Sequence, residues 1–238
     1  MKAVIIDDER LARKELSSLL TEHPQIQVVD EAQNVDEALD KINEHQPDVI
    51  FLDIQMPEKT GFDLLEMLDK VPIVVFTTAY DEYAIKAFDF GAFDYLLKPI
   101  DGDRLAEAIH KVATEYKKNQ HLEKDDLLKP SDQVFVKDGE KCWFVKLEKV
   151  RLFESDGNYI KVYFDNFRPM IHKSLNALNE KLDERSFFRI SRKHIINLGW
   201  IEKIEPWFNG GLMVELKGGQ KVEVSRRQAS KFKEKMSL

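Results

Sequence analysis

Cysteine is almost absent from this 238-residue sequence, and other features that would mark a secreted or membrane protein are missing too. The single cysteine, Cys142, cannot form an intrachain disulfide, which excludes a small secreted fold held together by disulfides. No apolar run approaches the ~18 residues that a membrane-spanning helix needs. Acidic residues follow the short apolar start Ala3–Ile6 at once, so no signal peptide is expected. We therefore expect a soluble, cytoplasmic protein with no membrane partner.

Charge is unevenly distributed along the chain. The sequence carries 36 basic and 43 acidic residues, a net charge of -7. Residues 1–120 hold 13 basic and 25 acidic residues, whereas residues 132–238 hold 21 basic and 15 acidic residues. The length suits two domains, and an apolar content of 43% allows each a buried core. An acidic half joined to a basic half suggests two tasks, with the basic half a candidate for binding a polyanion.

Short apolar runs alternate with amphipathic stretches in the first half. The runs are of strand length and rich in β-branched or aromatic residues: Ala3–Ile6, Ile26–Val29, Val49–Leu52, Ile73–Phe76 and Phe93–Leu97. Helical patterns follow them: Leu11–Leu20, a start at Asn34, Gly61–Leu68, Ala84–Phe90 and Leu105–Tyr116. Five βα units in series predict a doubly wound α/β domain, with a parallel sheet covered by helices on both faces.

The second half has a different pattern. Seven of the 10 glycines lie after residue 131, and turn pairs such as Asp138-Gly139 and Gly218-Gly219 separate short apolar runs. Only two helical patterns appear, around Leu175–Leu182 and Arg227–Met236. This half is expected to be mostly antiparallel β with short helices. The predicted organisation is a first domain over 1–118, a polar linker over 119–131 and a second domain over 132–238.

Five polar groups follow four of the predicted strands in the first half. Asp7 and Asp8 come after the first strand, Asp53 after the third, Thr78 after the fourth and Lys98 after the fifth. The carboxyl ends of parallel strands meet at one edge of a sheet, where ligands bind, so these groups should lie together. Each Asp alone could be a loop residue or a helix cap. Because five such groups all follow strand ends, the pattern favours a ligand-binding site.

Such a cluster suits phosphoryl transfer. Three carboxylates repel one another, so a cation should lie among them, and hard oxygen ligands suit Mg²⁺. A carboxylate can attack phosphorus to form an acyl phosphate, while a metal and a lysine offset charge on the oxygens. A rival interpretation is a phosphatase of the dehalogenase type, whose members carry Asp-x-Asp after the first strand. Here Asp53-Ile54-Gln55 follows the third strand, and Gln55 cannot be a general acid.

The motifs resemble the receiver domain of bacterial two-component response regulators over about residues 1–120. The matching strings are Val4-Ile5-Ile6-Asp7-Asp8-Glu9, Asp53-Ile54-Gln55-Met56-Pro57, Phe76-Thr77-Thr78-Ala79 and Leu97-Lys98-Pro99. The resemblance implies a flavodoxin-like sheet with strand order 2-1-3-4-5 and a phosphoacceptor regulator, not an enzyme. It also implies that Asp53 takes a phosphoryl group from a sensor histidine kinase.

The same resemblance implies roles for the residues around the phosphoacceptor. Asp8, Asp53 and the backbone oxygen of Gln55 would bind Mg²⁺ directly, and Asp7 would assist through a water molecule. Thr78 and Lys98 would contact the phosphoryl oxygens, and a cis bond is expected between Lys98 and Pro99. Tyr95, three residues before Lys98, matches the aromatic switch position of the family and would follow Thr78 on phosphorylation.

Residues 132–238 resemble a LytTR-type DNA-binding domain, an all-β module whose loops enter successive major grooves. The matching strings are Phe153-Glu154-Ser155-Asp156-Gly157-Asn158-Tyr159, Phe187-Phe188-Arg189-Ile190-Ser191-Arg192, Ile195-Ile196-Asn197, Glu205-Pro206-Trp207-Phe208-Asn209-Gly210 and Val224-Ser225-Arg226-Arg227. This chain has Ser191, Lys193 and His194 where the family usually has His, Ser and Tyr. The added positive charge favours DNA as the partner.

The residues expected to face DNA are Asn158, Lys161, Lys173, Arg189, Arg192, Lys193, Arg226 and Arg227. Arginine can bond guanine edges and phosphates through two hydrogen bonds, while lysine holds phosphates. Phosphorylation would lead to a homodimer with two β domains on neighbouring half-sites of promoter repeats, about one helical turn apart. The alternative is a phosphorylation-gated interaction module whose β domain binds protein or RNA, since loop arginines serve those partners too.

Overall fold

The structure, a computed structural model, describes residues 1–79, 92–119 and 127–237, which form two compact units. The first comprises Met1–Glu123, Gln133–Phe135 and Lys141–Phe144, and the second comprises Lys124–Asp132, Val136–Glu140 and Val145–Leu238. The predicted helix Ala84–Phe90 and positions 120–126 of the predicted linker lie outside the described residues. The predicted domain boundaries, with the first domain ending at 118 and the second beginning at 132, stay a prediction. In the described ranges, no helix is long and apolar enough to span a membrane.

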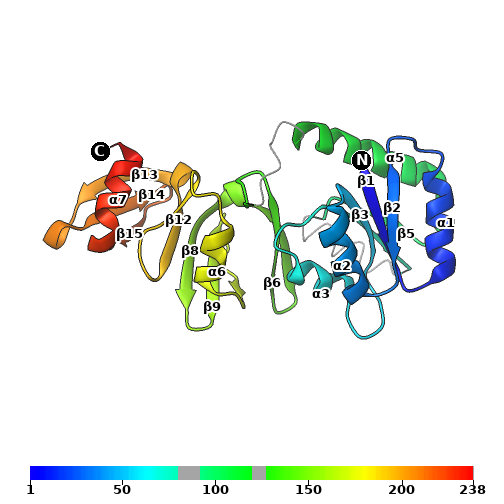
Figure 1. The fold of residues 1–238 in the computed structure, drawn as a ribbon, viewed down its shortest axis with the longest axis horizontal. Helices are drawn as coiled ribbons and strands as arrows, with labels where there is room; N and C mark the ends of the chain where they lie inside the picture. The colour runs from blue at the N-terminus through cyan, green and yellow to red at the C-terminus, as the bar shows by residue number, and fades with distance from the viewer. Residues whose placement is uncertain (80–91, 120–126, 238) are drawn as a thin grey trace. The chain divides into compact units, whose positions relative to one another are not determined.

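A five-stranded parallel sheet with the order β2-β1-β3-β4-β5 forms the centre of the first unit (Figure 1), which confirms the predicted doubly wound α/β fold. Its strands are β1 (Lys2–Ile6), β2 (Gln27–Ala32), β3 (Val49–Asp53), β4 (Ile73–Thr78) and β5 (Asp94–Leu97). Its helices are α1 (Arg10–Leu20), α2 (Val35–His45), α3 (Gly61–Met67) and α5 (Gly102–Asn119). Asn34 caps α2 as predicted, because its side chain accepts a hydrogen bond from the Glu37 amide.

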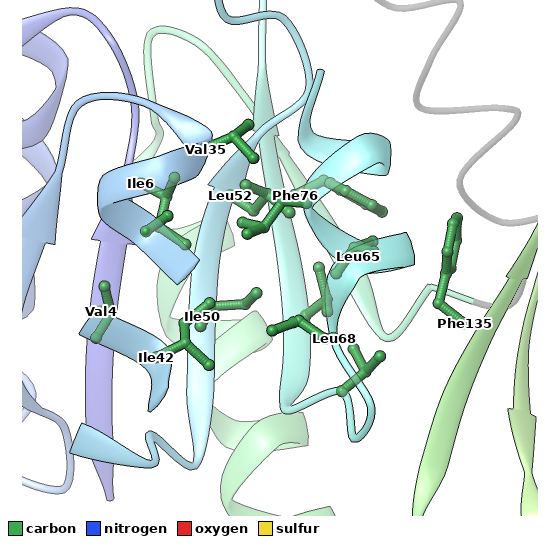
Figure 2. Close-up of a cluster of buried hydrophobic side chains, with 14 of the residues drawn as sticks. Val4, Ile6, Val35, Ile42, Ile50, Leu52, Leu65, Leu68, Phe76 and Phe135 are labelled. Carbon is green, nitrogen blue, oxygen red and sulfur yellow. The ribbon is translucent and has the colours of Figure 1, made fainter. Parts of the chain in front are cut away.

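Two apolar cores cover the faces of this sheet. Residues of α2 and α3 pack on one face (Figure 2), and residues of α1 and α5 pack on the other. Every residue of β3 is buried, as expected for a central strand of a parallel sheet with helices on both faces. The cores therefore hold the carboxyl end of β3, and with it Asp53, in a rigid frame.

Two short segments from later in the chain complete the first core. Phe135 and Cys142 are buried within it, and Phe144 packs against it (Figure 2 labels Phe135). The rings of Phe62 and Phe135 stack with centroids 6.2 Å apart, and the ring of Phe144 meets that of Phe76 edge to face at 6.3 Å. These residues come from β6 (Gln133–Asp138) and β7 (Lys141–Lys146), which form a two-stranded sheet. The first unit therefore includes residues from beyond position 132.

The second unit is mainly antiparallel β, as predicted. One sheet has the order β10-β9-β8-β12-β11 and another has the order β13-β14-β15. The strands are β8 (Val150–Asp156), β9 (Tyr159–Phe164), β10 (Met170–Ile171), β11 (Phe187–Arg189), β12 (His194–Asn197), β13 (Ile201–Pro206), β14 (Leu212–Leu216) and β15 (Gln220–Val224). The helices are α6 (Leu175–Lys181), α7 (Arg226–Met236) and the 3₁₀ turns η1 (Leu147–Lys149), η2 (Leu198–Trp200) and η3 (Phe208–Gly210).

An ion-pair cluster inside the first unit provides a test of its stability. The Asp94 side chain is fully buried and pairs with Arg104 and Lys111. Burial alone would raise the pKa of Asp94, but hydrogen bonds from Arg104 and Lys111 outweigh it and lower the pKa. The pair therefore stabilises the fold above the ordinary Asp pKa of about 3.9, and this stabilisation is lost as the pH falls through the lowered folded-state pKa.

Asp94→Asn should destabilise the first unit by about 2 kcal/mol at neutral pH, because it leaves a partly buried guanidinium without its carboxylate. The figure is below that for a fully buried pair, since Arg104 and Lys111 keep 30% and 52% of their side-chain exposure. Urea unfolding of the full chain measures the change, with the exposed Asp40→Asn as control. Equal stability of Asp94→Asn and the wild type would contradict it.

Candidate functional site

The acidic residues predicted to form a site lie together at the carboxyl edge of the parallel sheet. Asp7 and Asp8 directly follow β1, and Asp53 is the last residue of β3. Each offers a carboxylate oxygen, and these oxygens lie within 4.8 Å of one another. Asp53 is only 6% exposed, whereas Asp8 keeps access to solvent. The structure therefore brings together the three carboxylates from the ends of β1 and β3, as the sequence predicted.

Lys98 lies among these carboxylates. Its ammonium is 2.7 Å from Asp7 Oδ2 and 2.6 Å from Asp53 Oδ2. Burial raises the pKa of Asp53, and the nearby Lys98 only partly offsets this. Burial acts to lower the pKa of Lys98, but the hydrogen bonds that its ammonium donates to Asp53 and Asp7 outweigh it and raise the pKa. Lys98 is therefore a fixed positive charge beside Asp53. The bond between Lys98 and Pro99 is cis, as predicted.

Arg13, which the sequence analysis did not single out, fixes the loop that carries Asp7 and Asp8. Its Nη1 donates to the Asp7 carbonyl at 2.7 Å and to the Asp8 carbonyl at 3.3 Å. Its Nε donates to Glu31 at 3.2 Å. Because both partners in the loop are main-chain oxygens, no motif of side chains marks this role in the sequence.

Gly61 is a second residue that the sequence analysis missed. It is the first residue of α3, and a Cβ at this position would lie 2.4 Å from the main-chain oxygen of Asp53. Its amide donates to the Ile54 carbonyl at 2.9 Å. The start of α3 therefore packs directly against the main chain of the residue that carries the central carboxylate.

The carboxylates open into a cavity of about 450 Å³. Lining residues include Gln55 after β3, together with Thr77 and Ala79 at the end of β4. Thr78 is fully buried, and its carbonyl accepts a hydrogen bond from the Lys98 amide at 2.8 Å. The main chain of Thr78 is thus bonded to that of Lys98. Of the two threonines that end β4, however, Thr77 and not Thr78 lines the cavity. The role of Thr78 in binding a phosphoryl group stays a prediction.

Tyr95 lies in β5, where a guanidinium covers it. Arg104 is 5.7 Å from the centre of the Tyr95 ring and donates to the Tyr95 carbonyl at 2.9 Å. The same guanidinium pairs with Asp94, the preceding residue. Tyr95 is half-buried, and its main chain is held in place from α5. Its role as a switch stays a prediction.

The donor set fits a hard divalent cation. Mg²⁺ prefers carboxylate and carbonyl oxygens and usually retains several waters. Asp7, Asp8 and Asp53 supply the carboxylates, and Gln55 lines the same cavity. The three carboxylates and the Lys98 ammonium leave a formal excess of two negative charges, which one divalent cation balances.

Most of the basic residues predicted to face DNA surround one loop of the second unit. Arg192 and Lys193 lie in the loop between β11 and β12, and Arg189 is the last residue of β11. The Lys193 carbonyl accepts a hydrogen bond from the Ser155 amide at 2.8 Å, which joins this loop to the end of β8. The Ser225 amide donates to the Ile190 carbonyl at 2.9 Å. The start of α7, with Arg226 and Arg227, therefore lies next to the same loop.

Three further candidates lie in or beside β9 and β10, within the same sheet. Asn158 is in the turn between β8 and β9, where Gly157 has a φ of 62°. Lys161 pairs with Asp156 across this turn at 2.5 Å, so part of its charge is already balanced. Lys173 follows β10, and its amide donates to the Ile171 carbonyl at 3.0 Å.

Comparison with known proteins matches both units. Residues 3–110 match the response regulator receiver domain family, and residues 140–237 match the LytTr DNA-binding domain family. The chain is 36% identical over 241 residues to the "Sensory transduction protein LytT" of Enterococcus faecalis, covering 100% of both chains.

Solved structures resemble each half separately. The response regulatory domain of protein mrkE from Klebsiella pneumoniae is 36% identical with a TM-score of 0.45, over 50% of this chain and 99% of that one. The LytTr DNA-binding domain of a Bacillus cereus response regulator is 24% identical with a TM-score of 0.43, over 44% of this chain and 97% of that one. With both family matches and a relative that covers its whole length, the chain belongs to the two-component response regulators that join a receiver domain to a LytTR DNA-binding domain.

Proposed function

We propose that Asp53 accepts a phosphoryl group from a sensor histidine kinase, and that this controls dimerisation and binding to promoter DNA. The observation that carries the proposal is the position of Asp53, buried at the edge of the sheet, 2.6 Å from Lys98 and open to a cavity. A carboxylate there can reach an incoming phosphoryl group, and the adjacent ammonium stabilises the negative charge of that phosphoryl group. Membership of the response regulators fits a regulator that is not an enzyme.

In the transfer, an Asp53 oxygen forms a bond to phosphorus while the bond between phosphorus and the kinase histidine nitrogen breaks. Lys98 is placed to exchange its contact with Asp53 for one with a phosphoryl oxygen. Asp7, Asp8, Asp53 and the Gln55 main-chain oxygen would hold Mg²⁺. When bound, Mg²⁺ supplies positive charge that offsets the charge on the transferring group. Thr78 and Tyr95 would report the change to the surface of the receiver.

For the second unit, we propose that the loop between β11 and β12 and the start of α7 contact double-stranded DNA. Support comes from the concentration of cations there, with Arg192 and Lys193 both exposed. Helix α7 has no acidic residue in its first turn but two arginines, and its Ser225 cap makes no side-chain hydrogen bond. The positive end of the helix dipole and the arginines both favour a phosphate nearby. Asn158, Lys161, Lys173 and Arg189 belong to the same proposed surface.

Phosphorylation should strengthen binding to a site with two half-sites by about 100-fold, because a dimer makes the second contact at high effective concentration. A preferred duplex is first selected from a random pool with protein treated with a small phosphoryl donor. Fluorescence anisotropy then gives the affinity with and without the donor. Binding should weaken steeply as salt rises, because phosphate contacts release counterions.

The control is a duplex with a single half-site, for which phosphorylation should change affinity far less. Equal affinity and stoichiometry in both phosphorylation states would contradict the switch. A flat response to salt, or selective retention of RNA over duplex DNA, would contradict DNA as the partner.

A further inference from the structure

The loop between β11 and β12 presents two adjacent cations at the surface of the second unit. Arg192 and Lys193 are exposed, and neither side chain makes a hydrogen bond or an ion pair with the part of the chain that the structure describes. Asp156 lies near enough to Lys193 for their charges to interact, but it forms no ion pair with Lys193. Two exposed cations side by side repel each other, so such a pair is suited to a polyanion. The main chain of this loop is nevertheless held firmly.

Arg189 differs from its two neighbours because its guanidinium is already engaged. Its Nε donates to the Ser191 carbonyl at 3.2 Å, and its Nη2 donates to the Arg192 carbonyl at 3.0 Å. Its Nη1 donates to Asn176 Oδ1 in α6 at 2.6 Å. One rigid planar fork therefore joins two successive carbonyls of the loop to a helix on its flank.

Ser191 fixes the same loop from within. Its Oγ accepts hydrogen bonds from the amides of Lys193 and His194, each at 3.1 Å. A hydroxyl that accepts hydrogen bonds from the amides two and three residues ahead closes a tight turn. Together with the hydrogen bond from the Ser155 amide to the Lys193 carbonyl, these contacts fix the loop before any ligand binds.

We propose that Arg189 is a positioning residue of the DNA-binding surface, which shapes the loop so that Arg192 and Lys193 make the contacts. The proposal rests on DNA binding as the function of this unit. Three of the five N–H donors of Arg189 are already used, and a bidentate contact to a guanine or a phosphate through the Nε and Nη2 edge would have to break the bonds that this edge makes to the loop. Arg189 also offsets the partial negative charge of the two loop carbonyl oxygens to which it donates. A loop held in shape loses less entropy on binding than a mobile one.

The test uses Arg189→Lys, which keeps the positive charge but loses the fork, alongside Arg192→Ala and Asn176→Leu in the full-length protein. Affinity for the selected duplex is measured over a range of salt concentrations. Arg189→Lys should bind about 10-fold more weakly with the wild-type salt slope, whereas Arg192→Ala should weaken binding and reduce the slope by about one. Asn176→Leu, which removes no charge, should weaken binding several-fold with an unchanged slope.

Hydrogen exchange of the Lys193 and His194 amides, measured by mass spectrometry without DNA, provides an independent readout. Exchange should be about 10-fold faster in Arg189→Lys and unchanged in Arg192→Ala. Wild-type affinity and wild-type exchange in Arg189→Lys would overturn the proposal. Wild-type exchange in both Arg189→Lys and Asn176→Leu would also overturn it, even if affinity fell. A wild-type protein that binds no duplex would instead refute DNA binding, while the exchange experiment would still decide whether Arg189 holds the loop.

Discussion

Replacing Asp53 by asparagine should abolish phosphoryl uptake by the chain. An amide has nearly the shape of a carboxylate but cannot form an acyl phosphate under the same conditions. The substitution should leave the fold intact, because Lys98 keeps its ion pair with Asp7. Incubation with a small phosphoryl donor and Mg²⁺, followed by intact-protein mass spectrometry, should show one phosphoryl group on the wild type and none on Asp53→Asn.

The matched control is Asp40→Asn, which changes an exposed aspartate outside the site. It should take up the phosphoryl group as the wild type does. Wild-type stoichiometry of an acid-labile label on Asp53→Asn would show that another residue is the acceptor, and the proposed function would then have to be abandoned.

Gly61→Ala should be nearly as damaging, although position 61 carries no side chain that could take part in chemistry. The added Cβ would lie 2.4 Å from the main-chain oxygen of Asp53 and 3.1 Å from Leu52 Cγ. A main-chain oxygen of a buried central strand cannot rotate away, so either the start of α3 or the end of β3 must shift. We expect a loss of about 3 kcal/mol in the free energy of unfolding, at the upper end for overpacking.

The same substitution should slow phosphoryl uptake at least about 10-fold, because small displacements of a reacting group are costly. Gly102→Ala is the matched control, since Gly102 also begins a helix and a Cβ there would meet no atom within 4 Å. Urea unfolding and the rate of phosphoryl uptake are measured on both variants. If Gly61→Ala matched Gly102→Ala in both measurements, the close approach of α3 to Asp53 would matter neither for stability nor for phosphoryl uptake, and the prediction would be wrong.

Local patterns were sufficient to predict the sheet and the meeting of its polar strand ends. The apolar runs rich in Val and Ile became β1, β3 and β4, because only a strand buried on both faces accommodates such continuous runs. Once the strands are parallel, Asp7, Asp53 and Lys98 must share one edge. Their convergence therefore follows from strand order and not from any long-range detail.

The contacts that refine this site depend on groups that sequence patterns do not reveal. Arg13 bonds to main-chain oxygens, and Gly61 matters because of what it lacks. Arg189 illustrates the same limit in the second unit. Its charge suggested a DNA contact, but its three hydrogen bonds depend on where α6 and the following loop lie. Residue type and spacing thus identify a basic surface more readily than they show which of its residues contact the ligand and which position the others.

The packing of Phe135, Cys142 and Phe144 onto the first core has a practical consequence for fragments of this protein. A fragment that ends near residue 119 would lose Phe135 from beside Phe62, Phe144 from beside Phe76, and Cys142 from the core. Aromatic surface uncovered in this way promotes self-association. Such a truncated receiver would then associate because of the exposed aromatic surface and not because of phosphorylation. Experiments on phosphorylation-dependent dimerisation are therefore best designed with a chain that extends past residue 144.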